Sequence, residues 1–344
     1  MATPRVAEGP PPTPLTYTRR LVARVPRISR GTATFIVKRL ALLVFTVFFV
    51  SSLIFMLVHS LPGNALIGPH LIGKALQKQL HTFGLDQPLV VQWWTFITNA
   101  VHGNLGVSYV IENEQVTPLV LRELSVSCEL GGAALLITIG LGVSVGVIAA
   151  VRHNTWVDYI LTSLAVIGYT VPSFIIATLF YLFFGVFLAN VTNGAFSYPL
   201  EWTGTYGNLA ELSVPAFAIG LYTAGQVARI TRASMLDVLQ QDYVRTARAK
   251  GLRPRSVIIR HALRNSLVPV VSILGPTIIS IIVGVVVIEN IFGVPGLGKE
   301  FVTSITTHDY NVTVGVFTMF AALIGAANLA VDLIYTVIDP RIRY

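Results

Sequence analysis

Apolar residues form six long runs along this chain, separated by polar segments of very different length. A helix rises 1.5 Å per residue and the hydrocarbon core of a bilayer is about 30 Å thick, so about 20 apolar residues cross it. The runs therefore predict an all-α, polytopic membrane protein with six spanning helices. These are Leu40–Val58, Leu130–Val151, Tyr159–Leu188, Leu212–Ala233, Leu267–Ile288 and Val312–Ile338. Pro172, which follows Gly168 in the third run, predicts a kink or a division of that helix into two pieces.

The composition agrees with lipid as the solvent of this chain. Of its 344 residues, 53% are hydrophobic and 12% are charged, whereas a soluble domain carries about 25% charged residues. The net charge of +8 is compatible with nucleic acid, but apolar runs separate the basic clusters, so no nucleic acid partner is expected. The single cysteine, Cys128, excludes an internal disulfide and a multi-thiolate metal site. The histidines lack metal-ligand spacing and no nucleophile–base pair is visible, so we expect no cofactor, metal or catalysis.

The distribution of Lys and Arg predicts the orientation, because cytoplasmic segments carry an excess of these residues. If the six spans alternate in direction, 20 of the 24 Lys and Arg residues lie on the same side of the membrane as the N-terminus. The other four are Lys74, Lys78, Arg122 and Lys299. We therefore expect both termini in the cytoplasm. The first apolar run is too long for a cleaved signal peptide, so it should anchor the chain.

Four regions follow from this topology. We expect a disordered basic cytoplasmic tail at residues 1–34, a first spanning helix at 35–59 and an extracytoplasmic loop at 60–123. Residues 124–344 should form a core with five further spanning helices and a cytoplasmic loop at 234–266.

The extracytoplasmic loop is too long to be a plain connector, and long ordered loops usually have a function. One interpretation is a docking surface for an external partner protein, with Trp93, Trp94, Asn104 and Leu105 as candidate contacts. The alternative is a lid that merely packs on the helix bundle, and the residues leave both open.

The basic segment between the fourth and fifth runs has a helical pattern with one interruption. Asp242 is expected to cap a short helix, Tyr243–Lys250, because its carboxylate can accept hydrogen bonds from the first amides of the helix. Gly251 suits the left-handed position that ends such a helix. Pro254 suits the first turn of a second helix, where a missing amide proton costs nothing. The segment therefore predicts a helix–glycine–helix finger.

This finger combines small residues with cations. On its second helix, Ile258 with Ala262 and Ile259 with Leu263 lie four apart, on one face. One interpretation is docking in a groove of another protein, whose acidic rim pairs with the cations. The other is adsorption to anionic headgroups, which does not account for the glycine break. The cations are Arg245, Arg248, Lys250, Arg253 and Arg255.

The segment Asp-Tyr-Val-Arg-Thr-Ala-Arg-Ala-Lys-Gly-Leu, residues 242–252, resembles the cytoplasmic signature loop of permease subunits in binding-protein-dependent ABC importers. Within that family it is most similar to the dipeptide and oligopeptide branch. Ala247 and Gly251 occupy the family's alanine and glycine positions, whereas Arg245 and Thr246 replace its usual Glu and Ala. The resemblance implies that the loop inserts into a cleft of an ATPase subunit. The coupling residues it implies are Asp242, Tyr243, Arg245, Thr246, Ala247, Arg248, Ala249, Lys250, Gly251 and Leu252.

Further landmarks of the family occur in the expected order, so the resemblance covers nearly the whole chain after the tail. They are Arg39-Leu40, Leu61-Pro62-Gly63-Asn64, Gly84-Leu85-Asp86-Gln87-Pro88, Gly103-Asn104-Leu105-Gly106, Phe292 to Gly298, Asn328-Leu329 and Asp339-Pro340-Arg341. The resemblance implies the type I importer permease fold in a bacterial inner membrane. It also implies a second homologous permease, two cytosolic ATPase subunits or domains and an external substrate-binding protein as partners, with the ATPases hydrolysing the ATP. Peptides are the favoured cargo, and nickel, glutathione or oligosaccharides are the alternatives.

The segment from Gly293 to Glu300 comes close to the phosphate-binding pattern GxxxxGK followed by Ser or Thr. Glu300 stands where the magnesium-binding hydroxyl should be, and the predicted topology places the segment outside the cytosol. We therefore interpret it as a tight turn after the fifth spanning helix.

Ionisable side chains within or beside the spans are candidate functional groups, because a charge at the bilayer centre is costly. Glu129, Glu289 and Asp158 lie near helix ends that water should reach, which favours structural roles. Asn328, Asp332 and Tyr335 form a polar stripe on the last helix. The stripe could line a path, but a structural ion pair with Arg229 or Arg232 is favoured.

Two other classes of membrane protein compete with an importer subunit. A gradient-driven secondary transporter should show inverted repeats and mid-membrane carboxylates, and neither is evident. A membrane scaffold without transport would not need the glycine-broken basic finger. The sequence therefore favours an ATP-driven importer whose chemistry takes place on other chains.

Overall fold

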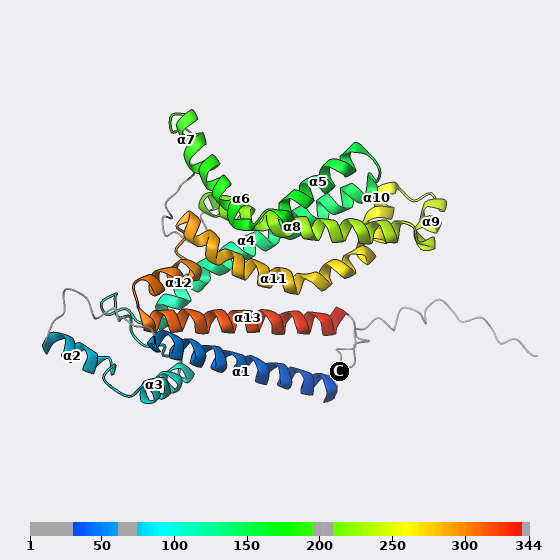
Figure 1. The fold of residues 1–344 in the computed structure, drawn as a ribbon. Coiled ribbons are helices and arrows are strands. Elements are labelled where there is room, and N and C mark those ends of the chain that lie inside the picture. Colours follow the sequence, from blue (N-terminus) through cyan, green and yellow to red (C-terminus); the bar gives the residue numbers. More distant parts are fainter. Residues whose placement is uncertain (1–29, 61–73, 196–197, 199–201, 203–208, 339–344) are drawn as a thin grey trace, which may run out of the picture.

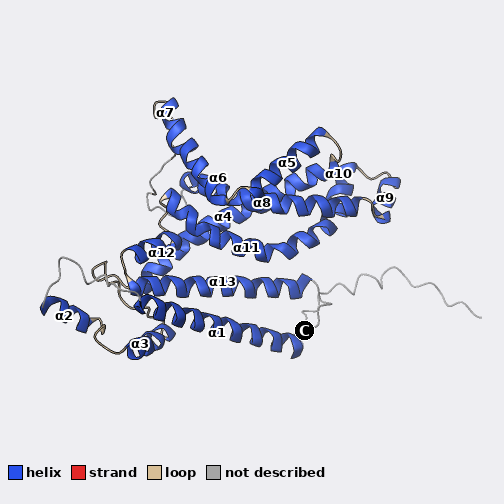
Figure 2. Cartoon of the chain, viewed as in Figure 1, coloured by secondary structure: helices blue, strands red, loops and turns tan. Residues whose placement is uncertain are grey.

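The computed structural model describes residues 30–60, 74–195, 198, 202 and 209–338. Most of the predicted basic tail lies outside these residues, as does the C-terminal Asp-Pro-Arg. Every named element among the described residues is helical, with one isolated bridge between Val107 and Gln115 (Figure 2). This all-α fold agrees with a membrane setting, where backbone groups must bond within their own segment.

Helices occupy all six predicted spans. They are α1 (Arg30–Ser60), α4 (Val116–Val151), the divided third span, α8 (Leu209–Leu239), α11 (Arg264–Phe292) and α13 (Tyr310–Ile338). Five described segments are long and apolar enough to cross a membrane, namely Thr34–Ser60, Val116–Val151, Ser173–Val191, Pro254–Phe292 and Tyr310–Ile334. The span expected at Leu212–Ala233 is helical within α8 but is not among these five. The count of six spanning helices therefore stays a prediction.

The third predicted span is divided at its proline. It consists of α5 (Trp156–Thr170), α6 (Ser173–Phe180), the π-helix η3 (Tyr181–Phe187) and α7 (Leu188–Val191). Pro172 is extended at the start of α6, with φ −54° and ψ 138°. Figure 1 shows α6 and α7 diverging from the direction of α5. The expected division is confirmed, because proline cannot continue the hydrogen-bonding pattern of α5.

Small residues hold α4 and α8 together at very short range. A Cβ atom on Gly142 would lie 2.7 Å from Cβ of Val227, and one on Gly146 would lie 2.6 Å from the carbonyl oxygen of Ala228. The two backbones therefore approach closely, as small residues allow in membrane helix pairs. Leu130 and Ile219 are buried in the adjoining core, to which α6 and α11 also contribute.

A second core lies at the other side of the fold, where α1 runs alongside α13 (Figure 1). Buried Phe55, Leu119, Leu297 and Val312 come from α1, α4, α12 (Leu297–Thr306) and α13. The segment before α4 adds α2 (Lys74–Thr82) and α3 (Leu89–Val101), and Phe96 of α3 reaches this core. The predicted extracytoplasmic loop, called the outer segment after its predicted location, thus packs on the bundle through α3.

The α4–α8 contact predicts opposite outcomes for two glycines of the same helix. Gly146→Ala would place its methyl group against Ala228 and Thr231, so overpacking should cost about 1–3 kcal/mol. Gly140→Ala is the matched control, because nothing lies within 4 Å of its Cβ position. Thermal unfolding of the detergent-purified chain should show a lower midpoint for Gly146→Ala alone. Equal midpoints for the two variants would contradict the close contact.

Candidate functional site

The basic finger lies beyond the end of α8, at one end of the fold (Figure 1). It consists of α9 (Asp242–Ala249), a turn at residues 250–253, α10 (Pro254–Ser256) and the π-helix η4 (Val257–Leu263), which runs into α11. Pro254 opens its helix, as expected. The helix–glycine–helix organisation predicted from the sequence is therefore present.

Gly251 closes α9 in the left-handed conformation. Its φ is +74°. The N–H of Gly251 donates to the carbonyl oxygen of Arg248 at 2.9 Å, and the N–H of Leu252 donates to the carbonyl oxygen of Ala247 at 3.4 Å. These two bonds form a Schellman motif, which satisfies carbonyls at the end of a helix. No atom lies within 4 Å of a Cβ placed on Gly251. The requirement for glycine therefore comes from the backbone alone.

The cap expected from Asp242 is wrong. Asp242 is the first residue of α9, and Gln241 precedes it without a side-chain capping bond. The Asp242 carboxylate instead lies 3.7 Å from the Arg245 guanidinium, one turn further on. A carboxylate in the first turn still interacts favourably with the helix dipole, although it bonds no orphan amide.

One face of α9 belongs to the core of this chain. Val244 and Ala247 are buried, and both pack with Val257 of η4 against the end of α8. The small residue at position 247 therefore permits close packing within the chain. Tyr243 ties the start of α9 to α11, because its hydroxyl accepts a hydrogen bond from Asn265 Nδ2 at 2.8 Å.

The π-helix η4 changes which residues of the second helix are buried. Val257 and Ala262, five residues apart, are both buried, Val257 in the cluster with Val244 and Ala262 in the cluster with Met235. Ile258 packs on the same small cluster as Ala262, whereas Ile259 is 49% exposed. The expected pairing of Ile259 with Leu263 on the packing face is therefore wrong, since the sequence was read with α-helical spacing.

The remaining face of the finger is exposed and cationic. The predicted coupling residues Arg245, Thr246, Arg248, Ala249 and Lys250 are all exposed, as are Gly251 and Leu252 beyond them. The Arg245 side chain is 69% exposed. Arg253 and Arg255 extend the exposed cations past the turn. α9 thus buries an apolar face and presents positive charge on its exposed side.

A buried carboxylate lies where the finger joins the bundle. Asp158 of α5 is 1% exposed, and the Arg232 guanidinium of α8 donates to both of its carboxylate oxygens at 2.7 Å. The Asn154 N–H and the Thr162 hydroxyl donate to the same carboxylate. The expectation that water reaches Asp158 is wrong, but its role is structural, because it ties α5 to α8.

The segment that resembles a phosphate loop binds a carboxylate of its own chain. Glu289 of α11 is fully buried, so the expectation that water reaches it is wrong. Its Oε2 accepts from the Gly298 N–H at 2.6 Å, at the start of α12. Its Oε1 accepts from the Ser127 hydroxyl at 2.6 Å. A Cβ on Gly296 would lie 2.1 Å from Oε1, so the glycines make room for the carboxylate. The expected turn is present, with Gly293 at φ +69°.

The polar stripe of α13 pairs with a residue that the sequence analysis did not select. Asp332 lies 2.9 Å from Nε of Arg39 in α1, so the expected pairing with Arg229 or Arg232 is wrong. Arg229 instead lies over the Tyr169 ring, 5.2 Å from its centroid. Asn328 is exposed one turn before Asp332. Tyr335 belongs to α13, but its side chain lies outside the described residues.

Asp309 fastens the outer segment to the start of α13. Its carboxylate accepts from the Ser108 hydroxyl and from the Tyr109 and Val110 amides. Asn311 adds a bond from its amide to the Val107 carbonyl at 2.9 Å. Burial, followed by the charge of Asp309, raises the pKa of Tyr109 above its usual range.

The four candidate docking residues of the outer segment do not share one surface. Trp93 packs against the second core and Leu105 is 7% exposed within it. Trp94 is 60% exposed, and Asn104 is exposed while its Oδ1 accepts from the Gly106 N–H. Two of the four therefore have structural environments, and external docking stays a prediction for Trp94 and Asn104.

Comparison with known proteins identifies a family. Residues 142–344 match the family described as binding-protein-dependent transport system inner membrane component, and residues 32–124 match the family of its N-terminal component. The oligopeptide transport system permease protein OppB of Escherichia coli (strain K12) is 36% identical over 90% of this chain and 99% of its own. The dipeptide transport system permease protein DppB of Bacillus subtilis (strain 168) is 36% identical over 90% and 98%. The glutathione transport system permease protein GsiC of Shigella flexneri is 36% identical over 90% and 99%.

The buried Asp158–Arg232 pair predicts a sharp loss of stability when one partner is removed. Arg232→Met should leave an unpaired buried carboxylate and cost about 3–5 kcal/mol, whereas the double variant with Asp158→Leu should recover part of that loss. Arg245→Met is the control, because its ion pair is exposed and exposed pairs contribute little. Thermal unfolding in detergent measures all three. A double variant no more stable than Arg232→Met would contradict the pairing.

Proposed function

This chain belongs to the family of binding-protein-dependent transport inner membrane components, and we propose that it forms half of a translocation path for di- and oligopeptides. It is a multi-pass, inner-membrane permease subunit of an ATP-driven importer. The proposal adds that peptides are delivered by an external binding protein, that the second half of the path is a homologous permease, and that two cytosolic ATPase subunits or domains supply the energy.

The finger carries the mechanical part of this proposal. Alternating access requires a difference in free energy between two states of the path, and that difference must come from outside a chain without chemistry of its own. The exposed cations of α9 match an acidic rim on an ATPase, and its buried face is packed on α8. A displacement of α9 by a nucleotide-driven partner would therefore move α8, and with it α4 and α5.

Peptides are the favoured cargo among the alternatives. Three relatives are named for oligopeptide, dipeptide and glutathione transport, and glutathione is itself a tripeptide. None of these three relatives is named for nickel or oligosaccharide transport. Cargo choice is assigned mainly to the external binding protein, with Trp94 and Asn104 of the outer segment as proposed contacts.

The conformation of Gly251 provides the sharpest test of coupling. Gly251→Val cannot adopt a positive φ without strain, so it should distort the end of α9 and uncouple transport from ATP hydrolysis in the reconstituted importer. Gly251→Asn is the matched control, because Asn tolerates the left-handed conformation. Peptide uptake and ATPase activity are measured together in proteoliposomes. Uptake at the wild-type rate by Gly251→Val would show that this finger does not couple.

Charge reversal on the finger tests the partner directly. The double variant Arg245→Glu and Arg248→Glu should lose the ATPase subunits in a pull-down from membranes that express the whole importer, because both side chains are exposed and should face acidic groups. Lys78→Glu, on the exposed outer segment, should retain them. If the double variant brings down as much ATPase as the control, the charge-pairing part of the proposal fails.

A further inference from the structure

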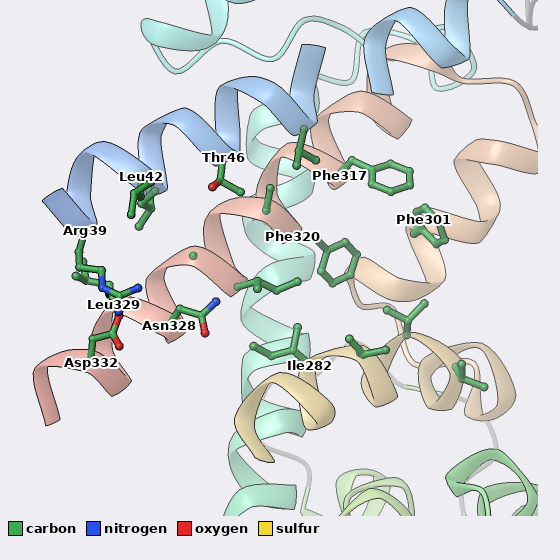
Figure 3. Close-up of a pocket in the computed structure, with 18 residues that line it drawn as sticks. Arg39, Leu42, Thr46, Ile282, Phe301, Phe317, Phe320, Asn328, Leu329 and Asp332 are labelled. Atoms are coloured by element: carbon green, nitrogen blue, oxygen red, sulfur yellow. Dashed lines mark ion pairs between the residues drawn. The ribbon is translucent and has the colours of Figure 1, made fainter. Parts of the chain in front are cut away.

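A groove of about 740 Å³ lies between α1, α11, α12 and α13 (Figure 3). Its two ends differ in chemistry. Arg39, Asn328 and Asp332 lie at one end, and Phe301 and Phe317 lie at the other. The walls between them are almost entirely aliphatic or aromatic. A groove with this polarity fits an amphiphile.

The length of the groove matches one leaflet of a bilayer. Along α1 it extends from Arg39 to Val50, which is about 16 Å at 1.5 Å per residue. The hydrocarbon core is about 30 Å thick, so one leaflet contributes about half of that. Both residues lie within the candidate span Thr34–Ser60. The predicted topology places the polar end on the cytoplasmic side.

The wall of the groove is irregular, because side chains of four helices contribute to it. A hydrocarbon chain is thinner than a helix and can follow an irregular wall.

The polar end presents both signs of charge. Nε of Arg39 lies 2.9 Å from Oδ2 of Asp332, and the two side chains are 40% and 17% exposed. A guanidinium has five N–H donors, and that of Arg39 directs Nε to Asp332 while its Cζ lies 5.3 Å from the centroid of the Phe35 ring. The end can therefore offer N–H groups to a phosphate and a carboxylate to an ammonium group. That combination matches a zwitterionic headgroup with a protonated amine.

We propose that this groove binds a zwitterionic glycerophospholipid of the phosphatidylethanolamine class. One acyl chain lies along α1 toward the phenylalanines, the phosphate contacts Arg39, and the amine faces Asp332. The lipid thereby fills the space between the α1–α13 pair and the rest of the bundle. This site does not depend on the identity of the transported cargo.

Photolabelling of the assembled importer tests the acyl-chain part. The complex is placed in nanodiscs containing phosphatidylethanolamine with a diazirine on the middle of one acyl chain, irradiated, and mapped by mass spectrometry. Thr46 lines the groove and points into it (Figure 3), so Thr46→Phe should lower adducts on the groove walls about tenfold. Val44→Phe is the matched control on an exposed position outside the groove and should keep them.

The headgroup part has its own comparison. Asp332→Asn should lower labelling by the phosphatidylethanolamine probe but not by a phosphatidylglycerol probe with the same acyl chain, because only the former carries an amine. Equal labelling of Thr46→Phe and Val44→Phe would overturn the lipid site. So would an efficient crosslink from Ile324→Cys, in a Cys128→Ser background, to a helix of the second permease, because that helix would then occupy the groove.

Discussion

The close approach of the α4 and α8 backbones is the contact on which the rest of the structure depends. Lipid tails are as apolar as leucine, so helices in a membrane associate through packing rather than through the hydrophobic effect. Gly142 and Gly146 remove the side chains that would hold α4 away from Val227 and Ala228 of α8. With that pair fixed, α8 also packs against α5 and α11. The glycines thus influence where two further elements of the bundle lie.

The same pair of helices forms the base on which the finger packs. Met235 of α8 is fully buried and packs with Ala150 of α4 and Ala262 of η4. Both α4 and α8 therefore contact the second helix of the finger. Asp158 and Arg232 fix α5 to α8 close to that point. In the proposed importer, these packed contacts would transmit a nucleotide-driven displacement of α9 to the spanning helices.

Local features of this fold could be predicted from the sequence, and long-range pairs could not. Pro172 and Gly251 impose their conformations on neighbouring residues, so the divided third span and the left-handed turn were predictable. Asp332 and Arg39 lie almost a whole chain apart, and their pairing depends on how α1 and α13 are rotated against each other. The glycine spacing at 296 and 298 was a signal of close approach, but only the fold shows that Glu289 is the group approached. The burial of Asp158 escaped prediction for the same reason, because its partner comes from another helix.

The number of residues in the π-helix η4, and not only their identity, determines the direction in which the finger points. The segment from Val257 to Leu263 forms i→i+5 hydrogen bonds instead of the i→i+4 bonds of an α-helix. Each residue of a regular α-helix turns the chain by about 100°. A family member with one residue fewer in this segment could form an uninterrupted α-helix, but its cations would then face a different direction. In the proposed importer, the number of residues in this segment therefore has to suit the shape of the partner that the finger would meet.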